Sequence, residues 1–268
     1  MSALARWDAF LAQIEARHRE VRTEAEAAAR QFIAGVAAGG DHLPLSHQLG
    51  AVEHRLQELE QKIIDTWHDK VEDAILGEGH GVDVRDAGHA QGLALQHALD
   101  DAREELMIRI AAELARQRYA HAEAQHGPVP CGRCGAALAA PVSFRALELP
   151  CACGAVTVWQ PPELMVSAGA LGTHAVPQEA ATAEWRAMRT AERAMHALRP
   201  PRPLAPVKAW ELAQIAYWRR YLQARSWFEP ELARDPAMEI RRRMQAWYES
   251  TAEFEEGWVA AGRPREPL

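Results

Sequence analysis

Apolar residues recur at intervals of three and four along the first part of the chain. Their period of 3.5 residues predicts one long helix with a seam like that of a coiled coil. Gly39 and Gly40 end the pattern, and Leu43–Ser46 predicts a turn in which Ser46 caps the next helix. The stripe consists of Leu4, Trp7, Leu11, Ile14, His18, Val21, Ala25, Ala28 and Phe32.

A second stripe predicts a helix that runs to about Leu76, and the short turn before it predicts an antiparallel pair. Residues 77–92 hold five glycines among polar residues, which predicts a loop. A third helix is expected from about Leu95 to His126. The second stripe is Leu49, Val52, Leu56, Leu59, Ile63 and Trp67, and the third is Leu95, Leu99, Ala102, Leu106 and Ile110.

Helical stripes return in the last third of the chain. One runs from Trp185 to Leu198 and another from Trp210 to Leu222. Asp235 followed by Pro236 predicts the start of a last helix, with a stripe from Ile240 to Trp258. The expected fold is mainly α, a long antiparallel helical bundle with an inserted small β ribbon. The expected regions are 1–127, a three-helix bundle, 128–162, the ribbon, and 163–268, a helical region packed on the bundle.

The inserted segment 128–162 carries all four cysteines. Cys131 and Cys134 are separated by two residues, Cys151 and Cys153 by one, and a glycine follows each pair. Such glycines suit a tight turn that brings two thiolates onto one metal ion. Short strands are expected around Val142 and Phe144, and around Val156 and Val158.

The first cysteine pair resembles a zinc-ribbon knuckle, and the resemblance covers about 35 of the 268 residues. The closed set Cys131, Cys134, Cys151 and Cys153 predicts one structural Zn²⁺. The single residue between Cys151 and Cys153 departs from the ribbon pattern, so His126 is an alternative fourth ligand. Cysteines without metal, reduced or paired in disulfides, are the competing interpretation. The helical remainder resembles uncharacterised bacterial helical proteins with a similar insert, which implies no activity.

Charge and composition limit the classes of partner that the chain is expected to bind. The formal net charge is −7, and residues 1–127 carry 13 Lys and Arg against 22 Asp and Glu. This acidic half and a neutral ribbon disfavour nucleic acid as a partner. No signal peptide and no run of about 18 apolar residues occurs, which predicts a cytoplasmic protein without membrane contact. In a reducing compartment, clustered cysteines favour metal binding over disulfides.

No catalytic motif accompanies the cysteines. His18, on the first seam, predicts a hydrogen-bonded core histidine. The segment Gly77–Gly81 lacks the Gly-Lys-Ser/Thr ending of a phosphate loop. The acidic pairs at 100–101 and 104–105 predict a solvated helix face, and the aromatic run at 217–221 predicts core packing.

These features predict a non-enzymatic zinc-binding scaffold or adaptor for protein–protein contact or self-association. Nucleic-acid binding through the ribbon and the Arg/aromatic C-terminal helices is the alternative. An enzyme in which zinc serves as a brace is a third hypothesis.

Overall fold

The computed structural model describes residues 2–36, 43–140, 143–199, 203–229, 232 and 235–252. The chain divides into two compact units, Met1–Ile110 and Ala111–Leu268. Helices dominate both units and the strands form two short antiparallel pairs, so the predicted mainly α class is confirmed. Within the described part of the chain, no helix has the length and apolar character needed to cross a membrane.

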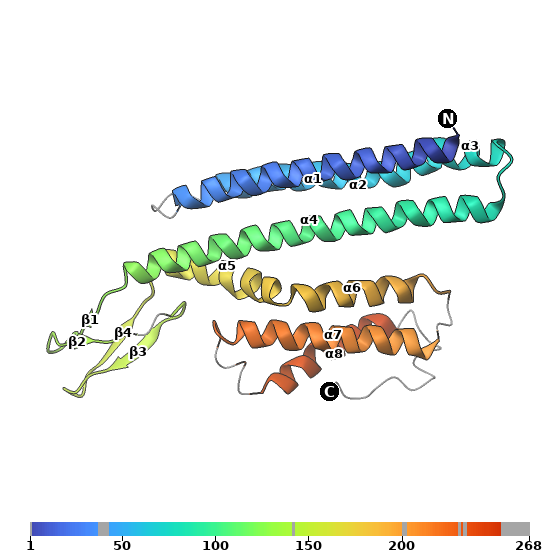
Figure 1. Ribbon diagram of the computed structural model, residues 1–268. Helices are drawn as coiled ribbons and strands as arrows, with labels where there is room; N and C mark the ends of the chain where they lie inside the picture. Colours follow the sequence, from blue (N-terminus) through green and yellow to red (C-terminus); the bar gives the residue numbers. More distant parts are fainter. Residues whose placement is uncertain are drawn as a thin grey trace. The chain divides into compact units, whose positions relative to one another are not determined.

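The first unit is built from long helices. Helix α1 spans Ala3–Val36 and α2 spans Leu43–Thr66, and the two lie side by side (Figure 1). A π-helical turn, η1, covers Trp67–Val71, and α3 covers Glu72–Gly77. Helix α4, Val82–Ala124, begins in this unit and ends in the next.

Contacts along the seam show that α1 and α2 run antiparallel, as predicted. The rings of Trp7 and Trp67 meet edge to face at 5.3 Å, whereas His18 lies 3.2 Å from Glu60. Residue numbers therefore rise along one helix and fall along the other. The core of this unit collects apolar side chains of α1, α2, η1, α3 and α4 around Trp7, Ile63 and Trp67.

Two predicted turn and loop assignments in this unit are wrong. Leu43–Ser46 forms the first turn of α2 rather than a connecting turn, so Ser46 lies within the helix instead of capping it. Pro44 is compatible with this position because the first turn of a helix needs no backbone donor there. Gly39 and Gly40 lie outside the described residues.

The second error concerns residues 77–92, which are helical from Val82 onward instead of a loop. The reason is packing of α4 against two tryptophans. A Cβ atom on Gly88 would lie 2.9 Å from the Trp67 ring, and one on Gly92 would lie 2.7 Å from Trp7. These two glycines serve close helix packing, and the turn itself is confined to Glu78–Gly81, where Gly79 has φ +81°.

The π-helical turn follows from the spacing of the α2 stripe. Ile63, Trp67, Val71 and Ile75 are all buried, at three successive intervals of four residues. In a regular α-helix each such interval advances the stripe by about 40° around the axis. The wider turn at Trp67–Val71 absorbs this drift, because a π turn accommodates extra residues per turn. The stripe therefore remains on the core side up to α3.

A buried ionic network also joins the helices of the first unit. Glu60 of α2 accepts a hydrogen bond from Nε of Arg103 of α4 at 3.1 Å, and its Oε1 lies 3.2 Å from Nε2 of His18. All three side chains are buried, which confirms the predicted core histidine. Asp100 and Glu104, predicted to lie on a solvated face, instead pair with Arg103.

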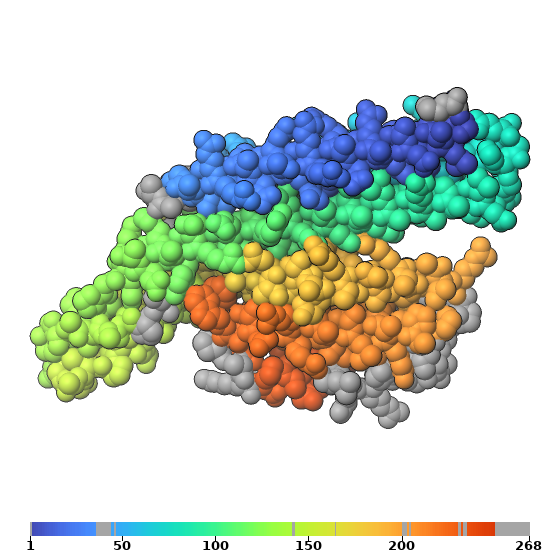
Figure 2. Space-filling view, viewed as in Figure 1, coloured from blue at the N-terminus to red at the C-terminus, as the bar shows by residue number. Residues whose placement is uncertain are grey.

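Within the described residues, the second unit combines two hairpins with the end of α4 and four further helices (Figure 2). Strands β1, Val129–Pro130, and β2, Ala137–Leu138, form one pair, and β3, Leu147–Pro150, and β4, Val156–Trp159, form the other. The helices are α5, Glu163–Ala180, α6, Thr182–His196, α7, Leu204–Arg225, and α8, Pro236–Ala252.

The core of the second unit gathers around α7. Trp210, Ile215 and Leu222 of α7 are buried together with Met195 of α6, in agreement with the predicted stripes. Asp235 caps α8 as predicted, because its Oδ1 accepts a hydrogen bond from the backbone N–H of Met238 at 2.9 Å.

The strand prediction for the second unit is correct only for Val156 and Val158. Phe144 lies in a bend rather than in a strand, and Val142 and Trp258 lie outside the described residues. The bend places the Phe144 ring against Gly169 of α5, where a Cβ atom would lie 2.3 Å away. Helix α5 itself had no predicted stripe, because its buried face is formed mainly by small residues such as Ala168, Gly172 and Ala175, with Met165 as a larger one.

The contact between Gly92 and Trp7 gives a test of the α4 packing. We expect Gly92→Ala to lower the free energy of unfolding, because an overpacking penalty of about 1–3 kcal/mol exceeds the gain in helix propensity of about 1 kcal/mol. Trp7 cannot easily move aside, since its Nε1 donates to Gly88 O at 3.0 Å. Gly50→Ala in α2, where no atom lies within 4 Å of the added Cβ, is the control and should stabilise the chain. The midpoint of urea unfolding measures both, and a rise for Gly92→Ala would contradict the packing.

Candidate metal centre

The four cysteines lie in the turns of the two hairpins. The backbone N–H of Cys131 donates to Ala136 O at 2.8 Å, and that of Cys151 donates to Ala155 O at 2.9 Å. Each bond extends the ladder of its hairpin by one step beyond the last strand pair. The first cysteine of each pair therefore stands where a strand enters its turn.

Glycine closes both turns with the same backbone conformation. Gly135 has φ +73° and Gly154 has φ +81°, a region that costs a side chain energy but suits glycine. Gly135 N–H donates to Cys131 O at 3.0 Å, and Gly154 N–H donates to Cys151 O at 2.9 Å. The Cys-x-Cys turn thus reproduces the Cys-x-x-Cys turn with one residue fewer.

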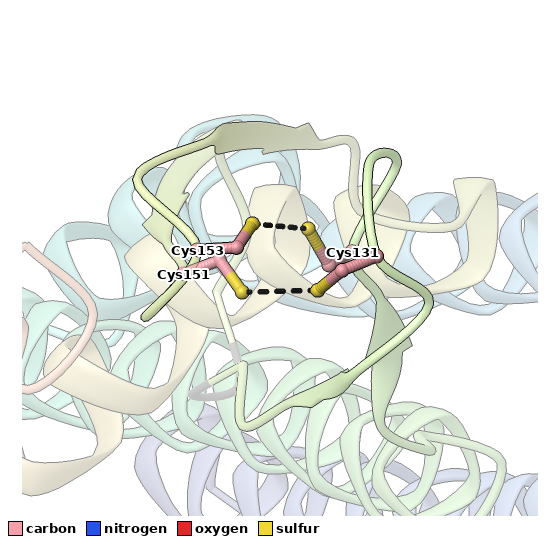
Figure 3. Close-up of side chains that lie close together, drawn as sticks. Cys131, Cys151 and Cys153 are labelled. Carbon is pink, nitrogen blue, oxygen red and sulfur yellow. Dashed lines mark hydrogen bonds between the residues drawn. The ribbon is translucent and has the colours of Figure 1, made fainter.

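The two turns bring four sulfur atoms together (Figure 3). All four Sγ atoms lie within 4.8 Å of one another. Across the hairpins, Cys131 Sγ lies 3.7 Å from Cys153 Sγ, and Cys134 Sγ lies 3.6 Å from Cys151 Sγ. These distances are far longer than a disulfide bond of about 2.05 Å, and the four cysteines are free. The cluster can hold one metal ion.

Backbone amides and neighbouring thiols adjust the acidity of the cysteines. Hydrogen bonds from the backbone N–H groups of Cys134 and Arg133 lower the pKa of Cys131 to about 6, against burial, which raises it. At Cys153 the backbone N–H of Ala155 lowers the pKa, but hydrogen bonds with the other thiols and burial together raise it to about 12. Without metal, the cluster therefore stabilises a thiolate at Cys131 beside a thiol at Cys153. Amide donors around a sulfur also orient a metal ligand.

Further contacts hold the two turns against each other. Gly132 N–H donates to Thr157 Oγ1 at 3.2 Å, and Arg133 Nη1 donates to Cys153 O at 3.4 Å. Both bonds run from the first turn to the second hairpin. Thr157 and Arg133 were not identified from the sequence, because no spacing rule marks a residue that links two turns. Cys131 is buried and Cys134 is exposed, so the cluster lies at the surface of its hairpins.

His126, the alternative ligand, lies elsewhere. Its Nε2 is 2.8 Å from Ala140 O, and its ring meets Trp159 at 5.3 Å. It helps to join the end of α4 to the second hairpin. Among the residues that the structure describes, the four cysteines are the only group of three or more His, Cys, Asp or Glu side chains placed to hold a metal ion.

Comparisons with protein-family models, with curated proteins and with solved structures found no match to this chain. The cysteine cluster and the surfaces around it are therefore the features that bear on the function.

The ligand set can be tested at its shorter turn. We expect Cys153→Ser to lower the affinity for metal at least about a hundredfold, because losing a ligand is costlier than losing an outer-shell partner, at 10–100-fold. Competition with a chelator of known metal affinity measures the change. His126→Ala is the matched control and should keep the metal affinity of the wild type. Unchanged affinity in Cys153→Ser, or an equal loss in His126→Ala, would show that the ligand set is wrong.

Proposed function

We propose that the chain is a non-enzymatic zinc-binding scaffold or adaptor. A structural zinc ion holds the two hairpins together as a zinc ribbon inserted in the helical protein, and the ribbon contacts a protein partner. The proposal also places the chain in the cytoplasm, where reducing conditions keep four thiols available as ligands.

The sulfur geometry is the observation that carries the zinc assignment. Four thiolates placed tetrahedrally at about 2.3 Å from a zinc ion lie about 3.8 Å from one another. The distances of 3.7 and 3.6 Å between sulfurs of opposite hairpins match this value. Four protein ligands also leave no open position for water or substrate, which is characteristic of a structural site rather than a catalytic one.

The exposed face of β4 supports the adaptor role. Val156 and Val158 are each 60% exposed, and they lie on the same face of the strand because side chains two residues apart point the same way. Apolar residues exposed singly are common, and this pair gives the ribbon a small apolar surface that a partner can cover. Pro150 and Glu148 are their cross-strand neighbours. We define Val156 and Val158 as the valine face.

The apolar seam of α1 also favours the ribbon as the contact surface, because that seam is already buried. Trp7, Leu11, Ile14 and Val21 of α1 are buried within the first unit. Self-association through that seam would require the unit to open. The valine face needs no rearrangement, which favours the ribbon over α1 and α2 as the contacting surface.

The nucleic-acid alternative has less support from the side chains it would need. Tyr217 and Tyr221 are buried, and burial raises the pKa of Tyr217 to about 12. The Arg243 guanidinium lies 4.3 Å from the Trp218 ring centre and also bonds to Glu239. Arg243 and the buried tyrosines are therefore engaged in packing rather than presented to bases.

Metal removal tests the structural zinc. We expect about one zinc per chain, and we expect a strong chelator to release it and unfold the hairpins, since metal binding and folding of such modules are coupled. Amide hydrogen exchange of residues 129–159 should accelerate after chelation, whereas that of α7 should stay slow. Iron instead of zinc would appear as visible absorbance and would refute the metal assignment. Unchanged exchange in metal-free protein would refute the structural role.

The valine face can be tested by a charge substitution. We expect Val156→Lys with Val158→Lys to weaken partner binding about tenfold or more, the effect of losing an interface anchor. The partner is obtained by crosslinking and co-purification from the native host, and sedimentation of the purified chain detects a second copy as partner. Met238→Lys, at a residue 61% exposed on α8, is the control. Equal loss in both variants, or no loss in the valine variant, would contradict the proposal.

A further inference from the structure

We propose that the first unit binds a small aromatic carboxylate in a pocket between the first turns of α1 and the π-helical turn η1. The pocket has a volume of about 280 Å³, and its wall includes Trp7, Phe10 and Val71, with Arg6 and Lys70 as the charged groups. This site is separate from the cysteines and is independent of the proposed adaptor role. We call it the η1 pocket.

The apolar wall is aromatic, with Phe10 half-buried at its surface and the buried Trp7 stacked on it. Trp7 and Phe10 stack with centroids 5.6 Å apart and planes 18° from parallel. Trp7 is held in place by its hydrogen bond to Gly88 O at 3.0 Å and by the ring of Trp67. A wall fixed in this way loses little conformational entropy on binding. Aromatic rings favour offset stacked or edge-to-face contact with such a wall.

The charged groups select an anion. Arg6 carries a guanidinium whose side chain is 57% exposed, and its ion pair with Glu78 is long, at 3.7 Å. Glu78 is also held by the backbone N–H of Ala3 at 2.9 Å, so it does not depend on Arg6. Lys70 is exposed and has no ion-pair partner among the described residues. A guanidinium and an ammonium at one apolar pocket suit a carboxylate, which Arg binds through two parallel hydrogen bonds.

The surrounding charge favours a single negative charge. Residues 1–127 carry an excess of nine acidic residues, so a phosphate dianion would meet stronger repulsion than a monoanion. The size of the pocket points the same way. A volume of about 280 Å³ lies just below the range of small-molecule sites, about 300–1,000 Å³, and suits a fused ring better than a peptide.

The π-helical turn contributes directly to the η1 pocket. It supplies Lys70 and Val71 to the pocket, and Thr66 before it completes the wall. Because the turn is wider than an α-helical one, it changes the direction in which Lys70 leaves the helix. Such turns occur often at functional sites, where the irregular backbone places a side chain that a regular helix could not.

Binding of 2-naphthoate to the metal-loaded full chain tests the proposal. Calorimetric titration and ligand-observed NMR measure the affinity, with the uncharged 2-naphthamide as matched ligand. We expect binding with a dissociation constant below about 1 mM, and we expect about tenfold weaker binding for Lys70→Gln and for Arg6→Gln, each of which loses one charge-assisted contact. The amide has no negative charge for either cation and should bind more weakly than the acid by at least about tenfold. Lys62→Gln, on exposed α2 surface, is the control and should bind like the wild type.

Several outcomes would overturn the η1 pocket as an anion site. No binding of 2-naphthoate at about 1 mM would do so, since it leaves no specific affinity to explain. Equal affinity for the amide would show that the cations play no part, and equal loss in Lys62→Gln would show a nonspecific charge effect. Naphthoate affinity that falls as protein concentration rises would show that a second copy occupies the pocket instead. Lys70 and Lys62 are both exposed, so neither substitution disturbs the core.

Discussion

The paired hairpins depend on the approach of four sulfur atoms, because they have almost no apolar core. Among the described residues of 128–162, only Cys131 and Leu149 are buried. A module of this size cannot offset the conformational entropy of its chain by apolar burial alone and needs a metal or a disulfide. The distances of 3.6 and 3.7 Å between opposite turns suit a metal. The zinc ion that we propose would thus be a condition for the ribbon and its valine face to exist.

An aromatic cluster fastens this module to the helices of the second unit. Phe144 lies between the hairpins along the chain, and its ring meets Tyr119 of α4 at 5.9 Å and Phe228, after α7, at 5.4 Å. Gly169 and Gly172 leave room on α5 for the rings of Phe144 and Phe228. The proposed zinc module would therefore be attached to the helices by packing that needs no metal. Loss of metal would disorder the hairpin turns first and reach the helices through contacts such as those of Phe144 and His126.

The sequence predicted those features that depend on residues close together in the chain. The heptad-like stripes predicted α1 and α2. The two cysteine pairs with their glycines predicted the cluster, because ligand spacing and turn conformation depend on neighbouring residues. The start of α4 was missed because Gly88 and Gly92 resemble loop residues until Trp67 and Trp7 are brought against them. The partners of Arg103 were missed for the same reason. The conformation and partners of these residues depend on contacts between distant segments, which a single sequence does not reveal.

The network around Arg103 explains how an acidic helical unit keeps one arrangement. Arg103 of α4 bonds to Glu60 and Glu53 of α2, and Glu60 also contacts His18 of α1. Apolar seams tolerate a slip by one turn, whereas a slip here would leave buried charges unpaired, at a cost of about 3–5 kcal/mol. The network therefore sets the register of the three helices. That register places η1 beside the first turns of α1, so the η1 pocket owes its shape to ion pairs outside its own wall.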